Sequence, residues 1–289
     1  MTGIPHQKTW LITGASSGLG KSLARHVLGQ GHLVLGTTRT VDRAKEQYPG
    51  FEKEGGVWVA MDPGRADTYD SVLKMMEKHE IDVVVNNAGF AFIGGVENSS
   101  EEEVRSQMEV NFYGPLRLIR AILPQMRQRR SGDIVLISSG AGFVARPGRG
   151  TYSASKFAIE AIHESLSHEV ASFAIRVLIV EPGAFRTPFA SNIVTPFKYR
   201  QSGGYSEVYR GTCVEQMVGA LVNSEQFLES VRGDPGRAAK AIFTSVENGH
   251  EYLRLPLGHD CVAALEEKIE SLRGDLNLTR QLAMSTSVD

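Results

Sequence analysis

The sequence predicts a single α/β domain in which about seven parallel strands form a doubly wound sheet with helices on both faces. Three observations favour this fold. The chain has 289 residues, 42 % of them hydrophobic, and can therefore bury one large core. Short apolar runs alternate with longer segments of helical periodicity along its whole length. A glycine-rich turn joins the first apolar run to the first helical segment.

Seven short runs are expected to form the strands, because most of them are apolar at successive positions, as strands buried on both faces are. They lie at residues 9–13, 32–38, 56–62, 81–89, 133–139, 175–182 and 251–257. The segments between them are long enough for the crossovers that parallel strands require. The first such segment carries Leu19, Leu23 and Val27 at helical spacing, and Gly31 marks its expected end.

Two segments depart from this alternation. Residues 188–233 have no strand signal and several aromatic residues, and we interpret them as an insertion on the sheet, not as a second domain. The polar residues 284–289 are expected to form a disordered tail. No repeat or linker divides the chain, so residues 1–289 are expected to form one domain.

The composition excludes several classes of protein. A formal net charge of −2 gives no electrostatic reason to expect nucleic acid or a membrane surface as a partner. Cys213 and Cys261 lack the spacing of a metal site, and two isolated thiols fit a reducing compartment. The sequence shows neither a signal peptide nor an apolar run of roughly 18 residues that could span a membrane. We therefore expect a cytoplasmic, metal-free protein.

The glycine-rich turn, "TGASSGLG" at residues 13–20, has the composition of a phosphate-binding loop. Glycine lets the backbone approach a pyrophosphate closely, and the following helix offers free N–H groups and a favourable dipole. Gly14, Gly18 and Gly20 form G-x-x-x-G-x-G, which differs from the G-x-G-x-x-G of many dinucleotide-binding proteins. The alternative is that these glycines only let the strand pack closely on the helix.

Further motifs follow the turn in a fixed order. They are "NNAG" at 86–89, Asn111 in "VNFYG", Ser139 at the end of the fifth strand, "YSASK" at 152–156 and "PGAFRT" at 182–187. Together with the turn they resemble the short-chain dehydrogenase/reductase family over essentially the full length. The segment "YSASKFAIEAIHESLSHEV" is most similar to the branch of 17β-hydroxysteroid and retinol dehydrogenases and their microbial relatives, carbonyl reductases among them. The resemblance implies a Rossmann-type sheet and a nicotinamide dinucleotide cofactor.

The resemblance also implies which residues bind that cofactor. They are Gly14, Ser16, Ser17, Gly18, Leu19 and Gly20 in the turn, Asn87, Ala88 and Gly89 at the ribose, and Pro182, Gly183, Phe185 and Thr187 around the nicotinamide. Tyr152 and Lys156 contact the cofactor as well. Asp62 matches the aspartate that bonds the adenine edge, although the Pro63-Gly64 that follows it departs from the family pattern.

The end of the second strand indicates which dinucleotide is bound. An NAD enzyme usually places a carboxylate there to bind the ribose 2′-hydroxyl. This chain has Thr38 and Arg39 instead. A carboxylate repels a 2′-phosphate, whereas a hydroxyl and a guanidinium can bind one. The sequence therefore predicts NADP(H); the alternative is that Arg39 is a solvated surface charge.

Tyr152 and Lys156 are four residues apart on a predicted helix and therefore share one face. An ammonium about 4 Å from a phenolate attracts it by about 4 kcal/mol at an effective dielectric near 20, before desolvation is subtracted. That attraction can lower the tyrosine pKa by up to about 3 from its usual value near 10. Tyr152 is thus the expected general acid and base.

Two more residues complete the predicted catalytic set. Ser139 is expected to hold the carbonyl oxygen on which negative charge grows. Asn111 matches the family asparagine that keeps a water molecule against Lys156 as a proton route to solvent. The resemblance therefore implies a reversible NADPH-dependent carbonyl reductase. The alternatives are a redox-neutral lyase, isomerase or cyclase on the same scaffold, and a cofactor-sensing regulatory protein.

The expected substrate is a mostly apolar ketone or aldehyde. Phe90, Phe92, Phe143 and Phe185 lie near catalytic positions in the sequence, and residues 188–233 are expected to close over the substrate as a lid. The alternative for that segment is a helical pair fixed on the sheet. Arg146 and Arg149 are expected on the solvated surface; the alternative is that they contact an acidic substrate. The resemblance further implies a homodimer or homotetramer formed through the helices that carry Asn111 and Tyr152.

Overall fold

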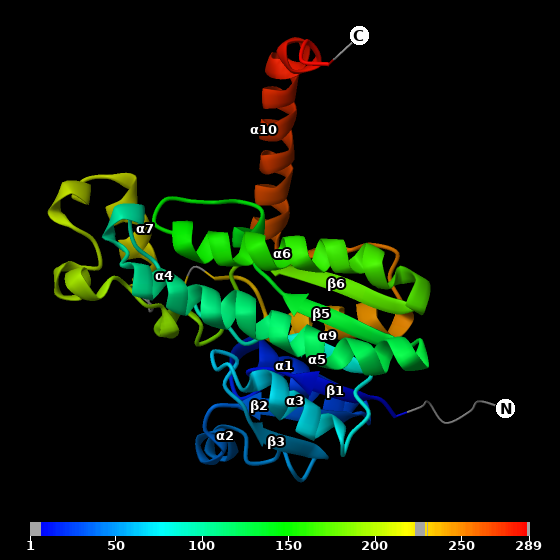
Figure 1. Ribbon diagram of the computed structural model, residues 1–289. Coiled ribbons are helices and arrows are strands. Elements are labelled where there is room, and N and C mark those ends of the chain that lie inside the picture. The colour runs from blue at the N-terminus through cyan, green and yellow to red at the C-terminus, as the bar shows by residue number, and fades with distance from the viewer. Residues whose placement is uncertain (1–6, 223–228, 230, 288–289) are drawn as a thin grey trace.

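A computed structural model describes residues 7–222, 229 and 231–287 (Figure 1). One sheet contains seven parallel strands in the order β3-β2-β1-β4-β5-β6-β7, which confirms the predicted fold. The strands are β1 (Thr9–Ile12), β2 (Leu33–Thr38), β3 (Gly56–Ala60), β4 (Val83–Asn86), β5 (Gly132–Ile137), β6 (Ile175–Pro182) and β7 (Arg254–Leu257). The order changes direction between β1 and β4, and ligands of such sheets bind at the carboxyl ends of strands near that point.

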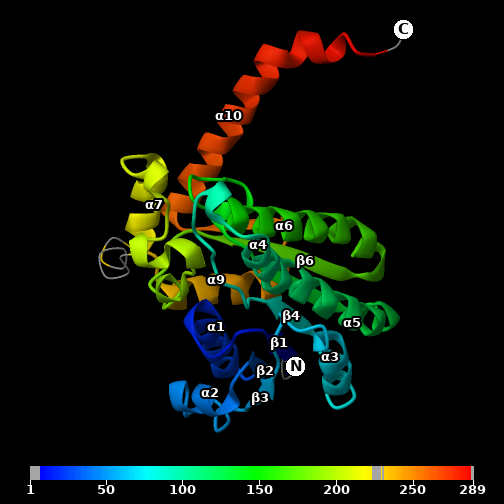
Figure 2. The same cartoon turned by 60° about the vertical axis from the view of Figure 1, so that its left-hand side comes forward.

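Helices cover both faces of the sheet. The helices of the described residues are α1 (Gly18–Gly29), α2 (Val41–Gln47), α3 (Thr68–Met76), α4 (Glu101–Met108), α5 (Gly114–Arg129), α6 (Gly150–Val170), α7 (Cys213–Val222), α9 (Pro235–Asn248) and α10 (His259–Met284). Helices α1 and α9 pack together on one face, whereas α3, α5 and α6 cover the other (Figures 1 and 2). No helix of the described residues combines the length and the apolar character needed to cross a membrane.

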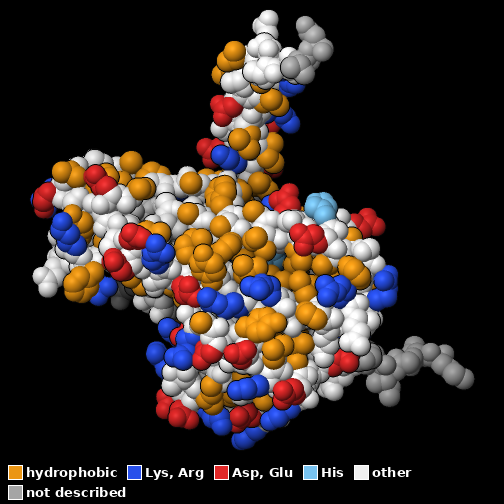
Figure 3. Space-filling model, viewed as in Figure 1, with side chains coloured by type: hydrophobic (Ala, Val, Ile, Leu, Met, Phe, Trp, Pro, Cys, Tyr) orange, Lys and Arg blue, Asp and Glu red, His pale blue; other side chains and the backbone are white. Residues whose placement is uncertain are grey.

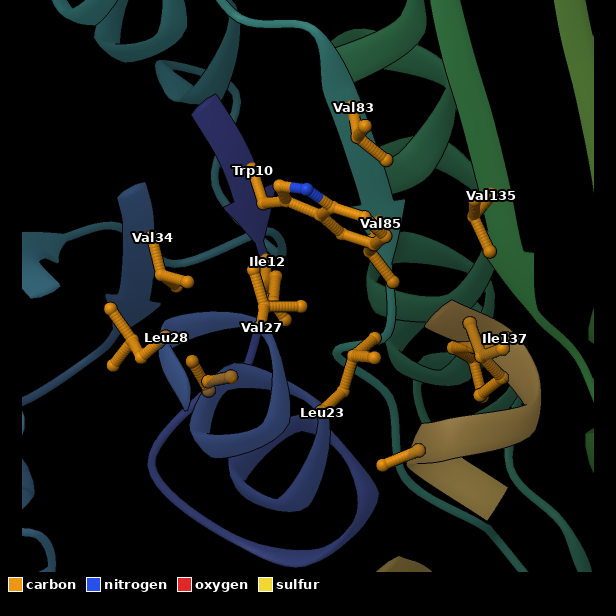
Figure 4. Packing of buried hydrophobic residues seen from close by; sticks show 14 of the residues in the cluster. Trp10, Ile12, Leu23, Val27, Leu28, Val34, Val83, Val85, Val135 and Ile137 are labelled. Carbon is orange, nitrogen blue, oxygen red and sulfur yellow. The ribbon is translucent and has the colours of Figure 1, made fainter. Parts of the chain in front are cut away.

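Two hydrophobic cores lie between the sheet and these helical layers. Trp10 and Ile12 of β1 face Leu23 and Val27 of α1 in one core (Figure 4). Leu11, which lies between them in the chain, belongs to the core on the other side. Successive residues of a strand point to opposite faces, and both faces here are covered by helices. The strands are therefore apolar at successive positions rather than at every second one.

The chain between α4 and α5 forms a π-helical turn over Glu109–Tyr113. Helix α4 begins with a capping box, in which Ser100 and Glu103 each bond the other's backbone N–H. Pro115 is the second residue of α5, directly after this π-helical turn, and without an N–H it cannot donate to a carbonyl of the preceding turn. Inserted π-turns often occur at functional sites. This one carries Asn111.

Residues 188–222 form short 3₁₀ turns followed by α7. They are tied to the loop after β4, because Ile93 donates its N–H to the Val194 carbonyl at 2.8 Å and Val194 donates to the Ala91 carbonyl at 2.9 Å. The rest of the predicted lid includes residues 223–228 and 230, which lie outside the described residues. In the predicted tail, residues 285–287 continue as turns after α10, and residues 288–289 lie outside the described part of the chain.

Helix α10 leaves the body of the molecule after β7 and projects away from it (Figures 1 and 2). Cys261, in its first turn, is the buried residue of this helix. The following residues are half-buried or exposed.

Candidate active site

A cavity of about 1180 Å³ opens at the carboxyl ends of the strands. Its walls come from the segments that follow β1, β2, β4, β5 and β6, and from the chain around residues 188–194. Pockets for single small molecules are usually about 300–1,000 Å³. The cavity therefore has the size expected for a dinucleotide together with a second molecule.

The glycine turn forms one wall of this cavity. Gly14 and Gly18 have φ angles of +66° and +55°, a region that favours glycine, and both line the cavity with Ser16, Ser17 and Leu19. Gly20 is buried below the turn, where a Cβ would lie 2.6 Å from the Gly14 carbonyl oxygen. The turn thus combines both interpretations: Gly20 permits close packing, and the other two glycines leave a cradle that fits a phosphate group.

Thr13 joins this turn to the "NNAG" loop. Its hydroxyl oxygen accepts hydrogen bonds from the Asn87 and Ala88 N–H groups, each at 2.9 Å. The Asn87 side chain donates in turn to the Thr13 carbonyl at 2.8 Å. Asn87, Ala88 and Gly89 then line the cavity, as the resemblance implies. Thr13 was absent from the predicted site because a single threonine at a strand end carries no signal of its own.

A cluster of polar and cationic residues lines the cavity near the end of β2. Thr38 and Arg39 lie there, and Arg43 of α2 joins them, although the sequence analysis did not identify Arg43. Among the described residues, neither arginine has an ion-pair partner. Asp62 also lines the cavity and accepts a hydrogen bond from the Gly64 N–H at 2.9 Å. The unusual Pro63-Gly64 thus forms a tight turn capped by the Asp62 side chain.

Ser139, Tyr152 and Lys156 line the same cavity, at the end of β5 and in the first turns of α6. Tyr152 is only 6 % exposed. Burial raises the pKa of its hydroxyl, and the hydrogen bond with Ser139 and the positive charge of Arg149 oppose that shift. The structure therefore brings the predicted serine, tyrosine and lysine together at one place.

Lys156 is buried at the wall of the same cavity. Its ammonium donates to the Ile137 carbonyl at 2.9 Å. Burial lowers the pKa of Lys156 to about 8, against the opposing charge of Glu160. The lowering of the Tyr152 pKa by Lys156 stays a prediction, and the structure adds Arg149 as a cation that lowers this pKa.

Arg149 precedes the first residue of α6, three positions before Tyr152. It lines the cavity and is half-buried, and its Nε atom has no hydrogen-bond partner among the described residues. Burial lowers the pKa of its guanidinium. The prediction of a solvated surface arginine is thus wrong for Arg149. Arg146 is exposed, as expected, and lies at the cavity rim.

Asn111 holds two walls of the site together instead of lining the cavity. Its Nδ2 donates to the Phe90 carbonyl at 3.0 Å and to the Ser155 hydroxyl at 3.1 Å, and its Oδ1 accepts from the Phe90 N–H at 3.2 Å. A Cβ on Gly89 would lie 3.0 Å from Asn111 Oδ1 and 3.8 Å from Lys156 Nζ. Asn111 and Lys156 therefore approach the same backbone, and the water relay between them stays a prediction.

The segment after β6 forms the wall opposite the glycine turn. Pro182, Gly183, Phe185 and Thr187 line it as predicted. The first turn of α10 completes this wall with Asp260, Cys261 and Ala264. Asp260 accepts a hydrogen bond from the Ala184 N–H at 2.8 Å, and a Cβ on Gly183 would collide with its carboxylate. The sequence analysis missed this contribution, because these residues follow Gly183 by more than 70 positions and match no motif.

Apolar side chains surround the space beside Tyr152. Its ring centroid lies 6.2 Å from that of Phe189. Other apolar residues of this region are Ile93, Val144, Ile193, Met217 and Leu221. Phe90 and Phe185 line the cavity as expected, but Phe92 is buried in the loop after β4 and neither Phe92 nor Phe143 reaches the wall. Within the described residues, no three His, Cys, Asp or Glu side chains are grouped as metal ligands.

Comparison with known proteins agrees with this site. The family model described as short chain dehydrogenase matches residues 8–196. The chain is 41 % identical over 182 residues to a 3-ketodihydrosphingosine reductase of Bacteroides thetaiotaomicron, covering 63 % of this chain and 65 % of that protein. It is 30 % identical over 240 residues to an NADPH-dependent 3-dehydrocapnine reductase of Ornithobacterium rhinotracheale, covering 80 % and 82 %.

A solved structure of a short-chain dehydrogenase from Streptomyces avermitilis has a similar fold. It matches with a TM-score of 0.84 and 34 % identity, over 98 % of this chain and all of that one. The family match covers more than half of the chain, and this structural match covers nearly all of it. This protein therefore belongs to the short-chain dehydrogenase/reductase family of NAD(P)-dependent oxidoreductases.

Proposed function

We propose that the protein uses NADPH to reduce the ketone or aldehyde group of a mostly apolar small molecule, in a reaction that is reversible. The observation that carries this proposal is the meeting of Ser139, Tyr152 and Lys156 in one cavity. The segment after Tyr152 is also the basis for placing the chain near the branch of 17β-hydroxysteroid and retinol dehydrogenases.

The end of β2 supports NADPH as the cofactor. Arg39 and Arg43 line the cavity without ion-pair partners among the described residues, and Thr38 adds a hydroxyl. Two guanidinium groups suit a 2′-phosphate because they offer charge-assisted, bidentate hydrogen bonds. The relative from Ornithobacterium is named as NADPH-dependent. When bound, the cofactor supplies or accepts the hydride.

The residues of the chain then supply orientation and the proton. The Ser139 hydroxyl donates a hydrogen bond to the substrate oxygen, where charge develops. Tyr152 donates its proton to that oxygen in reduction and removes it in oxidation. Arg149 stabilises the phenolate that Tyr152 leaves behind. Lys156, held by the Ile137 carbonyl beside Gly89, is placed for the ribose of the cofactor.

The walls around Tyr152 indicate the substrate class. Phe189, Ile193, Met217 and Leu221 give this part of the cavity an apolar surface, which favours a substrate with an apolar body. Both relatives are named as reductases, and one name describes a keto compound. Residues 188–233 contribute these four side chains, and we propose that this segment is the substrate lid.

An assay of NADPH oxidation with a panel of ketones, aldehydes and quinones tests this function. We expect turnover with apolar members of the panel, and we expect Tyr152→Phe to abolish it while NADPH affinity stays nearly unchanged. Lys156→Ala should reduce both turnover and cofactor affinity. Near-normal rates in Tyr152→Phe would instead favour a redox-neutral reaction, and tight NADPH binding with no turnover of any substrate would favour a cofactor-sensing role.

We also propose a cytoplasmic homo-oligomer that acts on a small molecule without nucleic-acid or membrane partners. Both cysteines are free thiols, as suits a reducing compartment. Hydrophobic side chains gather on the face formed by α5 and α6 (Figure 3), where Tyr113 and Phe157 are exposed. This face belongs to the helices that the family resemblance assigns to subunit contacts.

A further inference from the structure

Among the residues that the structure describes, helix α10 has no packing partner over most of its length. It spans 26 residues and projects from the body (Figures 1 and 2). Ile269, Leu272 and Leu276 are 47 %, 53 % and 50 % exposed. Most helices in proteins owe their stability to packing of an apolar face, and Gly274 in the middle of this one lowers its helix propensity relative to alanine. Local propensity therefore does not explain so long a free helix.

A heptad repeat connects six apolar residues and one threonine of α10, whereas the exposed Leu278, Leu282 and Met284 lie outside it. Alternating steps of three and four residues connect Val262, Leu265, Ile269, Leu272, Leu276, Thr279 and Ala283. We call these seven residues the seam. A repeat of this period places its members along one line of the helix and is typical of coiled coils. Thr279 fits the seam because its hydroxyl donates to the Asp275 carbonyl of the same helix at 2.8 Å.

We infer that the seam pairs with the seam of a second copy of this chain in an antiparallel coiled coil. Setting Ile269 against the partner's Leu272 places Leu265 against the partner's Leu276 and Val262 against the partner's Thr279. Each pair occurs twice, because a two-fold axis makes the contact self-complementary. From Val262 to Thr279 the paired length is about 27 Å, at about 1.5 Å per residue.

The charges beside the seam select this orientation. In the antiparallel pairing, Glu266 lies opposite the partner's Arg273, and Lys268 lies opposite the partner's Asp275. Symmetry doubles both pairs, so four pairs of opposite charge flank the seam. A parallel pairing would instead bring Lys268 next to the partner's Arg273, two like charges. It would also bring Asp275 next to the partner's Arg280, two opposite charges, so that the repulsive and attractive pairs would offset each other.

These flanking charges are free to form such pairs. Among the described residues, Glu266, Lys268 and Asp275 have no ion pair, and Arg273 has one with Glu270 at 2.9 Å on the exposed surface. Exposed ion pairs of that kind contribute little to stability. The composition of α10 therefore suits a second copy of itself better than an acidic, basic or purely apolar surface.

Light scattering of the full-length protein tests the contact. We expect Leu272→Glu to halve the mass of the wild-type assembly, because it places a carboxylate in the seam. Asn277→Glu adds the same charge away from the seam and should leave the mass unchanged. Circular dichroism should show that both variants keep the wild-type helix content of the body. An unchanged mass for Leu272→Glu at micromolar concentration overturns the proposal.

Charge exchange and cross-linking test the orientation. Lys268→Asp should lower the association constant of the antiparallel assembly at least several-fold, and adding Asp275→Lys should restore it. In a Cys213→Ser background, a mixture of Leu265→Cys and Leu276→Cys chains should form a disulfide-linked dimer. Leu276→Cys alone should not, because its two copies then lie about 16 Å apart along the axis, at about 1.5 Å per residue. Tighter association of Lys268→Asp, or cross-linking of Leu276→Cys alone, would indicate a parallel pair and overturn the inference.

Discussion

At the scale of single residues, the site combines the buried Tyr152 hydroxyl with the Arg149 guanidinium, a cation whose role sequence patterns did not identify. Tyr152 must lose and regain a proton, yet its burial opposes the charged form. Arg149 offsets this from the turn that precedes α6. Arg149 thus acts on this phenolate in addition to the Lys156 that the resemblance implied.

Arg149→Gln should therefore raise the pKa of Tyr152. Oxidation of an alcohol needs the phenolate, so the rising limb of its pH–rate profile should move to higher pH by about one pH unit, a tenfold change at a fixed pH on that limb. Arg149→Lys, which keeps the charge, should restore part of the wild-type profile. A lower rate with an unmoved limb would show that Arg149 holds the substrate and leaves the pKa of Tyr152 unchanged.

The cationic residues near the end of β2 give a second prediction at the scale of single residues. Arg39→Ala and Arg43→Ala should each weaken NADPH binding about tenfold, or about 1.4 kcal/mol, and leave NADH binding nearly unchanged. Wild-type protein should bind NADPH at least tenfold more tightly than NADH, and Thr38→Asp with Arg39→Ala should reverse this order. Titration of cofactor fluorescence measures the dissociation constants of NADPH and NADH. Equal affinities in the wild-type protein contradict the assignment.

At the scale of elements, helix α6 carries Tyr152, Lys156 and a buried histidine whose pKa changes on folding. His163 is fully buried, and its Nδ1 lies 2.8 Å from the Ile159 carbonyl oxygen. Burial lowers its pKa from 6.5 to about 4. In the unfolded chain the imidazole takes up a proton near pH 6.5, whereas in the folded chain it does so only near pH 4.

The free energy of unfolding should therefore fall as the pH drops from about 6.5 to about 4, by up to about 3 kcal/mol from this group. His163→Asn keeps a donor for the Ile159 carbonyl but does not titrate, so its stability should depend less on pH in this window. Urea unfolding at pH 7, 5.5 and 4.5 measures the difference. His168→Asn, an exposed control on the same helix, should keep the wild-type slope, and an unchanged slope in His163→Asn would sink the explanation.

The proposed lid is the second element with a testable behaviour. Its described part is tied to the loop after β4 through Val194 and through Asn98 and Ser206, whereas Phe189 and Met217 face the cavity. Hydrogen exchange in residues 188–222 should be fast in the free protein and slower with NADPH and a turned-over ketone. Strong protection without ligand would identify this segment as fixed scaffold.

At the scale of the whole molecule, the α5–α6 face and the seam of α10 are among the surfaces that expose apolar residues to solvent. They lie on different elements, so pairing through both would give a closed tetramer, whereas either alone gives a dimer. We expect light scattering of the wild-type protein at micromolar concentration to show one of these masses. A monomer would contradict both proposed contacts.

The sequence by itself determined the sheet, the order of its motifs and the residues of the glycine turn. These depend on patterns that are local: an unbroken apolar run needs cover on both faces, and Gly14 and Gly18 adopt φ angles that few other residues tolerate. The identities of Ser139, Tyr152 and Lys156 were likewise readable, because a tyrosine and a lysine four residues apart share a helix face.

Only the tertiary structure decided how these residues act and which others join them. Arg43, Arg149 and Asp260 reach the cavity from three different elements, and no spacing in the chain relates one to another. The direction of the Tyr152 pKa shift depends on which groups surround the hydroxyl, and one hydrogen bond orients the Lys156 ammonium toward the Ile137 carbonyl. Burial and electrostatic contact are properties of neighbours in space, and long crossovers set those neighbours independently of local sequence.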